Sequence, residues 1–244
     1  MTVRADLNID GIMGGAGGGL YRNVTINGHG SVNGNIDCAT FTSNGRSVVR
    51  GEVVASGQVD VNGLAVFEQD VEAGYMHVNG KAEVGGFLGA GRLRVDGHMK
   101  VGAGLSGESV EVNGYLGVKG SLEAESFRSC GSFRVDGLLN IGSLQAELYA
   151  GCQAKEIGGE TIEVRKPSGN SPFGQWVRSL IFGGDHLIAE TIEGDDIYLE
   201  STKAGVVRGK RVKLGPGCEI GVVEYSESYD QHPEAKVTDS RRIG

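Results

Sequence analysis

A repeat of seventeen residues between Gln58 and Glu125 constrains this chain more than any other feature. Four consecutive blocks align without a gap: QVDVNGLAVFEQDVEAG, YMHVNGKAEVGGFLGAG, RLRVDGHMKVGAGLSGE and SVEVNGYLGVKGSLEAE. Self-similarity at a fixed short period is typical of solenoids, in which each unit buries its apolar face only by stacking on the next unit. The repeat therefore predicts a stacked coil and not an ordinary globular core.

Each block carries three pairs of apolar residues, and the two members of a pair lie two positions apart. In the second block the pairs are Met76 with Val78, Ala82 with Val84, and Leu88 with Ala90. Residues two positions apart point to the same side of a β-strand. Short strands separated by glycine-rich corners are therefore expected, and one block predicts one turn of a triangular β-helix of about 17 residues.

An Asn-Gly or Asp-Gly pair occupies the same corner in every block, at Asn62-Gly63, Asn79-Gly80, Asp96-Gly97 and Asn113-Gly114. Such pairs favour the positive φ of a sharp bend, so we expect left-handed glycines here. Stacked turns would place the asparagine side chains one above another at the strand spacing of about 4.8 Å. We therefore also expect a ladder of amide hydrogen bonds along this corner.

Composition supports one elongated all-β body. The 244 residues include 43 glycines and 4 prolines, too many glycines for an ordinary globular domain, while the apolar columns are too regular for disorder. The net charge of −8 argues against a nucleic-acid partner, which needs a basic surface. Neither a signal peptide nor a membrane-spanning apolar run is recognisable, so a cytoplasmic location is expected, with membrane association left open.

The seventeen-residue frame extends over residues 1–166, with one extra residue near Ser56-Gly57. The segment IMGGAGGGL, residues 12–20, lacks inward apolar residues, so we expect an incomplete first turn or a loose glycine loop there. Residues 186–225 carry apolar pairs every five positions, which predicts a tighter coil of about fifteen residues per turn. Residues 226–244 are polar and show no pattern, which predicts a solvated tail.

Residues 167–185, PSGNSPFGQWVRSLIFGGD, interrupt the repeat. Their apolar residues follow helical spacing, so we expect a short amphipathic helix. The apolar stripe consists of Phe173, Trp176, Val177, Leu180 and Ile181. This stripe could dock on a membrane surface or on a partner protein. Packing against the side of the coil is the favoured alternative, because short helices gain most of their stability from packing.

The V-N-G turns, together with phrases such as VTINGHGSVNGNIDC and GSLEAESFRSCGSFRVDG, resemble the bactofilin family of polymer-forming bacterial cytoskeletal proteins. The resemblance covers residues 7–159 well and the coils after Asp185 more loosely. It implies a right-handed β-helix that assembles end to end into filaments without nucleotide. It also implies roles in cell shape, in motility or in placing partner proteins.

The outward side of the repeat carries titratable residues in its third column, which reads Asp60, His77, Arg94, Glu111 and Arg128. Such a column could form an acid–base site acting on a polysaccharide, but a solvated salt-bridge ladder is the favoured interpretation. His186 is the best candidate for the base of a β-helix acyltransferase, and that hypothesis is also not favoured.

The cysteines do not indicate a metal site. Cys38, Cys130, Cys152 and Cys218 lack zinc-site spacing, and the Gly-rich segment near the start lacks the Lys-Ser/Thr of a phosphate loop. We therefore expect no cofactor, no metal and no enzymatic activity.

The favoured function is structural, because a stacked coil exposes unpaired strand edges at its ends. The residues expected at the polymerising ends are Leu7, Ile9 and Ile26 at the start, and Val212, Leu214, Ile220 and Val222 at the finish. The partners would be further copies of the chain, with a related paralogue, membrane surfaces and client proteins as additions. A capped, non-polymerising scaffold is the alternative.

Overall fold

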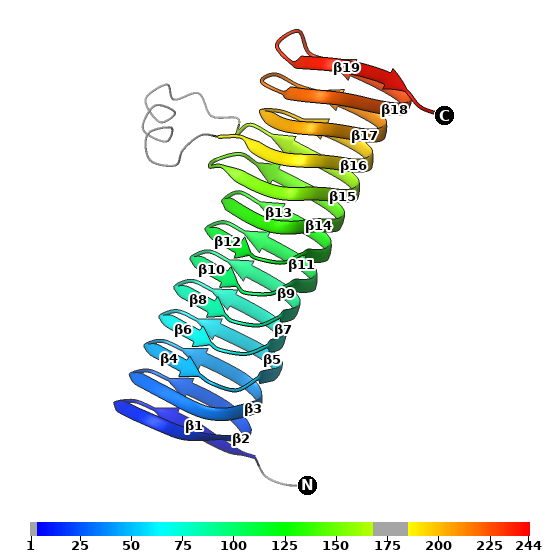
Figure 1. Cartoon of the computed structure of the whole chain (residues 1–244). Helices are drawn as coiled ribbons and strands as arrows, with labels where there is room; N and C mark the ends of the chain where they lie inside the picture. Colours follow the sequence, from blue (N-terminus) through cyan, green and yellow to red (C-terminus); the bar gives the residue numbers. More distant parts are fainter. Residues whose placement is uncertain (1–3, 168–184) are drawn as a thin grey trace, which may run out of the picture. The chain divides into compact units, whose positions relative to one another are not determined.

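The computed structural model describes residues 4–167 and 185–244, and all regular structure within these ranges is β-strand. The chain divides into two compact units, Met1–Gly120 and Ser121–Gly244. Strands within each unit pair in parallel, turn upon turn (Figure 1). The predicted all-β stacked coil is therefore confirmed in each unit. No helix in the described ranges is long and apolar enough to cross a membrane.

The described part of the first unit contains twelve strands. They are β1 (Ala5–Ile9), β2 (Ile12–Ile26), β3 (His29–Ser43), β4 (Arg46–Val49), β5 (Val53–Val61), β6 (Leu64–Phe67), β7 (Val71–Val78), β8 (Lys81–Val84), β9 (Leu88–Val95), β10 (His98–Val101), β11 (Leu105–Val112) and β12 (Tyr115–Val118). The described strands of the second unit are β13 (Leu122–Ser129), β14 (Ser132–Glu147), β15 (Cys152–Arg165), β16 (Leu187–Leu199), β17 (Thr202–Leu214), β18 (Glu219–Gln231) and β19 (Lys236–Arg242).

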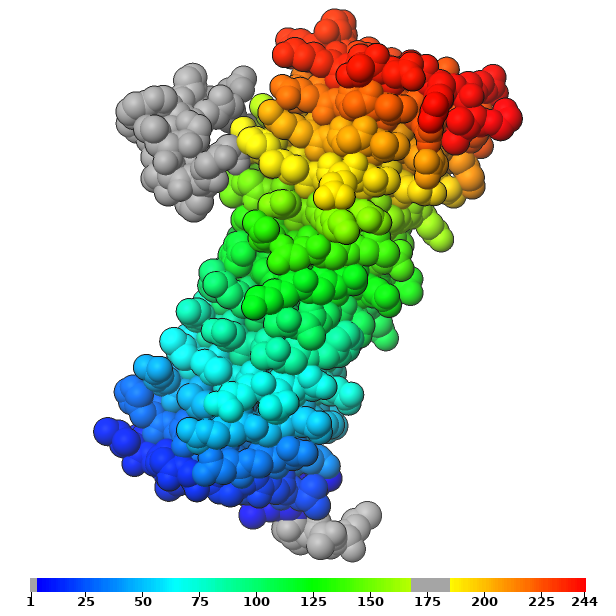
Figure 2. All heavy atoms as spheres, in the orientation of Figure 1, coloured from blue at the N-terminus to red at the C-terminus, as the bar shows by residue number. Residues whose placement is uncertain are grey.

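The register of the first unit follows the sequence repeat. Leu88 pairs with Leu105, and Lys81 pairs with His98, each seventeen residues apart. The pairing of β3 with β5 shifts by one residue at the extra residue near Ser56-Gly57. In the space-filling view the sequence colours of each unit follow one another band upon band, as stacking turns require (Figure 2).

The core of each turn is built from the three apolar pairs. In β9 two pairs are buried, Leu88 with Ala90 and Leu93 with Val95. The third pair, Met99 with Val101, is buried in β10. Residues two apart share a face, so the inward positions of successive turns stack as columns of valine, leucine and methionine. The inward columns predicted from the repeat are thus confirmed.

The corner glycines are required for a reason other than the predicted one. Among described residues, positive φ at glycine occurs at Gly15, Gly19, Gly34, Gly217 and Gly244, and not at the Asn-Gly corners. A Cβ atom at Gly80 would instead lie 2.0 Å from the carbonyl oxygen of Gly63 in the preceding turn. The prediction of left-handed bends was therefore wrong, and close approach between backbones is the cause.

The glycine-rich start is also different from expectation. Residues 12–20 are not a loose loop but part of β2, which pairs with β3 through partners such as Ile12 with His29. Backbone hydrogen bonds need no side chain, so a glycine run can join a parallel ladder. The ladder is nevertheless irregular, with register shifts after Met13 and Gly17.

Two predictions about residues 186–244 of the second unit were wrong. A spacing of fifteen residues holds between β16 and β17, where Ala189 pairs with Ala204, but Lys203 of β17 pairs with Glu219 of β18 at sixteen. Residues 186–225 are therefore not a uniformly tighter coil. Residues 226–244 are not a solvated tail, because they complete β18 and form β19 by main-chain pairing that needs no apolar alternation. The helix predicted within 167–185 lies outside the described residues.

Candidate functional site

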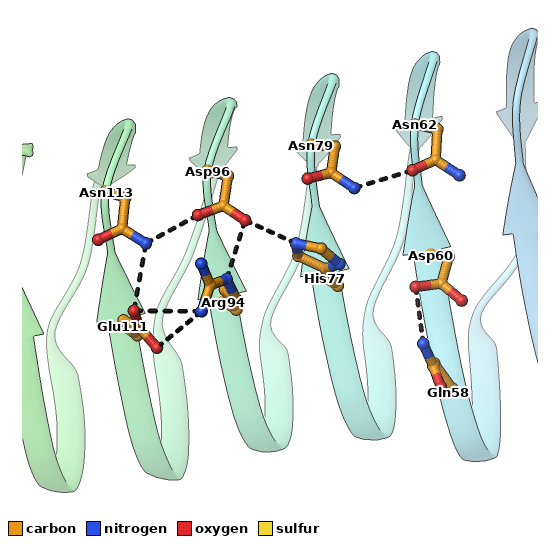
Figure 3. Close-up of polar contacts among 9 residues, drawn as sticks. All are labelled: Gln58, Asp60, Asn62, His77, Asn79, Arg94, Asp96, Glu111 and Asn113. Atoms are coloured by element: carbon orange, nitrogen blue, oxygen red, sulfur yellow. Dashed lines mark hydrogen bonds and ion pairs between the residues drawn. The ribbon is translucent and has the colours of Figure 1, made fainter.

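The charged column predicted from the repeat exists on the outward side of the first unit. Asp60 pairs in register with His77, His77 with Arg94, and Arg94 with Glu111. Gln58 Nε2 donates to Asp60 Oδ1 at 2.7 Å within the same strand, so Asp60 is engaged on its own turn (Figure 3). The fifth predicted member, Arg128, belongs to the second unit and is exposed.

Beside this column runs the predicted amide ladder of the first unit. Asn79 Nδ2 donates to Asn62 Oδ1 at 2.9 Å, and Asn62 donates likewise to Asn44. The ladder continues from Asn44 to Asn27 and ends at Asp10, whose Oδ1 accepts from Asn27 at 2.7 Å. The predicted ladder is confirmed. An aspartate suits its first position because a carboxylate only accepts hydrogen bonds.

Asp96 interrupts that ladder and is the centre of the polar cluster. A carboxylate has no N–H to give to Asn79, so Asp96 instead collects donors from its surroundings. Its Oδ1 accepts from Asn113 Nδ2 at 2.7 Å, and its Oδ2 accepts from Arg94 Nε at 2.9 Å. Nε2 of His77 lies 2.8 Å from the same Oδ2 (Figure 3). His77 and Arg94 thus replace the missing amide contact.

Electrostatics bind this cluster together. The Arg94 guanidinium holds the pKa of the Asp96 carboxyl well below its usual range, and hydrogen bonds from Asn113 and His77 add to the effect against partial burial. Asp96 in turn raises the pKa of Arg94. Arg94 Nη1 also reaches both carboxylate oxygens of Glu111 at 3.3 Å. The side chain of Asp96 is 28% exposed, so the cluster lies at the surface.

The arrangement favours a structural role for these side chains. A carboxylate whose pKa is lowered by an arginine is a weak base, and a general base needs a pKa near the working pH. Each member of the cluster bonds another member, which leaves little capacity for a substrate. In the described residues, no group of three or more His, Cys, Asp or Glu side chains could hold a metal ion.

The other candidate reactive groups are placed without a common site. His186 is half-buried just before β16, and its carbonyl oxygen accepts the N–H of Cys152 at 3.0 Å. Burial raises the pKa of both the Cys38 and the Cys152 thiols to about 11. These thiols stay protonated near neutral pH, and thiols are poor nucleophiles in that form.

The predicted polymerising residues are mostly internal. At the start, Ile9 and Ile26 are buried and Leu7 is half-buried. Val212, Leu214 and Ile220 were expected at a terminal surface, but they are at most 3% exposed because β18 and β19 follow them, and Val222 is half-buried. The predicted docking residues of the insertion lie outside the described residues, namely Phe173, Trp176, Val177, Leu180 and Ile181.

The sequence pattern did not identify the exposed apolar residues of the first turn as candidate functional residues. Ile12 is 91% exposed, Leu20 is 63% exposed and Met13 is 46% exposed. They flank the glycine run in β2, and their sequence signal is the presence of large apolar residues in a segment that lacks the inward columns. Their exposure makes the beginning of the first unit its most apolar surface feature.

The last turn of the second unit has the opposite character. In the columns that are apolar in β17, β18 keeps Ile220 and Val223 but also carries Tyr225 and Tyr229, and β19 keeps only Val237 beside Ser240 and Arg242. Polar residues at inward positions suit a turn on which no further described strand stacks. The first turn is therefore apolar at its surface, and the last turn is polar.

A groove of about 540 Å³ also lies on the second unit. Gly159, Gly194 and Gly209 occupy one column of consecutive strands and are among its lining residues. Its charged walls are internally paired, with Lys210 Nζ 2.8 Å from Asp195 Oδ2. The groove therefore presents few free charges to a ligand.

Asp96→Asn is expected to reduce the acid sensitivity of the protein. Because the folded pKa of Asp96 is lowered, its ion pair stabilises the fold above the unfolded pKa near 4, and this contribution is lost as pH falls toward the folded pKa. Thermal melts at pH 7 and pH 3 should show a smaller decrease for Asp96→Asn than for the wild-type chain. Asp60→Asn is the matched control in the neighbouring outward column of the same unit. An unchanged decrease in Asp96→Asn would contradict the assigned role.

Comparison with known proteins gives relatives without an assigned activity. The chain is 52% identical over 244 residues to the uncharacterized protein YhbE of Bacillus subtilis (strain 168), and the alignment covers 100% of both chains. It is 38% identical over 110 residues to the uncharacterized protein YhbF of the same organism, which is 44% of this chain and 42% of YhbF, less than half of that protein's length. No family model and no solved structure matches the chain.

Proposed function

The chain belongs to the same family as Bacillus subtilis YhbE, and we propose that it is a structural protein that assembles, without nucleotide, through the open end of its first unit. The exposed apolar turn at that end is the observation that supports the proposal. The product would be a filament or scaffold that supports cell shape, motility or the placement of partner proteins. Its coil would be right-handed and triangular, as the resemblance to bactofilins implies.

The first turn offers both components of a self-complementary contact. Ile12, Met13 and Leu20 expose apolar surface, and in the described part of this unit β1 pairs only with β2. The outer edge of β1 therefore carries backbone N–H and C=O groups without a ladder partner. An open edge next to apolar side chains is a template for strand addition.

Two copies would meet most simply by their first turns. A two-fold contact brings the same surface of both copies together, so one apolar surface is sufficient for a dimer. Growth into a filament needs a second contact, made by the polar last turn or with a related paralogue. The polar Ser240 and Arg242 of that turn favour the second candidate function, a non-polymerising scaffold that stops at the dimer.

We place the protein in the cytoplasm and assign it no cofactor and no catalytic residue, because the polar cluster around Asp96 is internally paired. The residue stripe from Phe173 to Ile181 stays a proposed docking element for a membrane surface or a client protein.

Glu substitutions in the first turn are expected to abolish self-association. Ile12→Glu and Leu20→Glu place charge on exposed positions, so the fold should survive while the apolar contact is lost. Sedimentation velocity and negative-stain electron microscopy of the purified chain should show a shift from assemblies to monomers, with at least about tenfold weaker association.

Phe87→Glu is the matched control, because Phe87 is 40% exposed in the same unit but outside the first turn. It should assemble like the wild-type chain. A wild-type chain that stays monomeric at all concentrations would contradict the proposal, as would assembly that persists in both first-turn variants. Dimers that never extend would support the scaffold candidate over the filament.

A further inference from the structure

From β16 to β18 the charges of the second unit alternate from turn to turn. The acidic strands β16 and β18 have four carboxylates each and no Lys or Arg. The basic strand β17 lies between them and has five cations and no carboxylate. The carboxylates are Glu190, Glu193, Asp195 and Asp196 in β16 and Glu219, Glu224, Glu227 and Asp230 in β18. The cations of β17 are Lys203, Arg208, Lys210, Arg211 and Lys213.

Ion pairs between successive turns use this alternation. Arg208 bridges both neighbours, with Nη1 3.0 Å from Glu193 Oε2 and Nε 2.6 Å from Glu224 Oε2. Lys203 Nζ lies 3.1 Å from Glu219 Oε2. A basic turn in this unit therefore has an acidic turn on each side. Opposite charges in register across strands stabilise a pairing, and like charges oppose it.

The last strand repeats the basic pattern but has a neighbour on one side. β19 carries Lys236, Arg241 and Arg242 against a single carboxylate, Asp239. Arg241 Nε donates to Glu224 Oε1 at 3.0 Å, and Lys236 is the register partner of Glu219. In the described part of the second unit β19 pairs with β18 alone, and Figure 1 shows it as the terminal strand.

We propose that β19 is a docking edge for an acidic β-strand of a partner protein, which adds as one further parallel turn. Main-chain groups on the outer edge of β19 would supply the hydrogen bonds, and charge complementarity would select the partner. The chain's own turns show what the partner strand must resemble, because the acidic β18 is the strand that pairs with the basic β17.

The register specifies where the partner's charges lie. Lys236 and Arg241 are five residues apart, so the partner strand carries two carboxylates five residues apart, as Glu219 and Glu224 are in β18. An apolar residue follows the first carboxylate and lies opposite Val237, which is half-buried. The expected partner segment is thus an extended strand with the pattern acid, apolar, three residues, acid.

Another copy of this chain fits the edge poorly. A second β19 would bring cations against cations, which opposes pairing. The first turn offers Asp6 and Asp10, but these are four residues apart, and Asp6 is already paired with Arg22 at 2.6 Å. A different protein is therefore the occupant.

The test uses the full chain and a synthetic peptide of residues 219–231, EIGVVEYSESYDQ, as the probe. Fluorescence anisotropy should show saturable binding that weakens with salt. A matched peptide with Glu219→Gln and Glu224→Gln should bind about fivefold to tenfold more weakly, because it loses two exposed ion pairs, which are individually weak and screened by salt. Backbone amide NMR shifts should map the bound peptide to β19.

Variants of the chain complete the test. Lys236→Ala and Arg241→Ala should each weaken the acidic peptide, while Lys81→Ala in the first unit should not. Lys236→Ala is the cleaner variant, because Arg241 also supports Glu224 and its loss could disturb the last turn. Equal binding of the two peptides, or no binding at all, would overturn the proposal. In that case the cations of β19 serve only to block strand addition.

Discussion

Gly80→Ala is expected to destabilise the first unit by more than about 3 kcal/mol, beyond the usual range for overpacking. The added Cβ would lie 2.0 Å from the carbonyl oxygen of Gly63 and 2.5 Å from that of Asn62. Both obstacles are backbone atoms. The Gly63 oxygen cannot retreat freely, because it accepts the N–H of Lys81 at 2.8 Å. Relief of the clash therefore requires separation of two turns and loss of ladder hydrogen bonds.

Gly89→Ala provides the matched control in the same unit. Its added Cβ would meet nothing closer than Glu72 Cγ at 3.7 Å, which is ordinary contact. We expect a change within about 0.5 kcal/mol for this variant. Denaturant unfolding followed by far-UV circular dichroism separates the two cases. Equal midpoints for both variants would show that close backbone approach does not explain the corner glycines.

The turns of the first unit could be predicted because they are repeated. An inward residue such as Met76 or Val78 is marked twice, by the two-residue spacing of its strand and by its equivalents seventeen residues away. The amide ladder could be predicted for the same reason, since equal corners must stack. The conformation of those corners could not, because spacing along the chain says nothing about how close the neighbouring backbone lies.

The edges of the fold were the part that the pattern missed. Lys236–Arg242 and the glycines of residues 12–20 form strands through main-chain hydrogen bonds, and these need no apolar periodicity. Once a stack exists, the adjacent turn is a template that extends the ladder into segments with weak propensity of their own. Sequence patterns detect the core columns and therefore underestimate the length of a solenoid.

Prediction of the polar cluster around Asp96 from the sequence had a similar limit. The column of His77 and Arg94 and the corner with Asp96 were each visible in the repeat, but their joining was not. The contact between His77 and Asp96 is diagonal, from one turn to the corner of the next, nineteen residues away. It exists because an aspartate at an asparagine position breaks the amide ladder and attracts donors, a consequence of side-chain chemistry within the stack.

The two terminal turns have different surfaces, which suggests different uses. The first turn exposes Ile12 and Leu20, whereas the last turn carries Lys236 and Arg241 next to acidic partners. Apolar surface suits a contact between identical copies, and a basic edge repels its own copy. A scaffold that joins to itself through one turn and to a different protein through another is consistent with both surfaces.

Phe67→Ala is expected to cost the first unit about 3–5 kcal/mol, the usual range for removing a buried aromatic ring. Phe67 is fully buried in β6, and its ring lies edge-to-face against Phe41 with centroids 5.4 Å apart. Each turn of a solenoid is supported mainly by its neighbours, so the cavity weakens the stacking of β4 and β8 on β6 as well. A lower unfolding midpoint should be visible by calorimetry and by faster amide exchange in these strands.

Phe87→Ala removes the same group from a position that is 40% exposed, so it should change the unfolding free energy by less than about 1 kcal/mol. Phe41→Ala, alone and combined with Phe67→Ala, tests the contact itself. The double variant should lose less than the sum of the single losses, by about 0.5–1.5 kcal/mol, because the ring pair can be removed only once. Strict additivity would mean that the two rings contribute separately to the core, and equal losses for Phe67→Ala and Phe87→Ala would contradict the assigned core column.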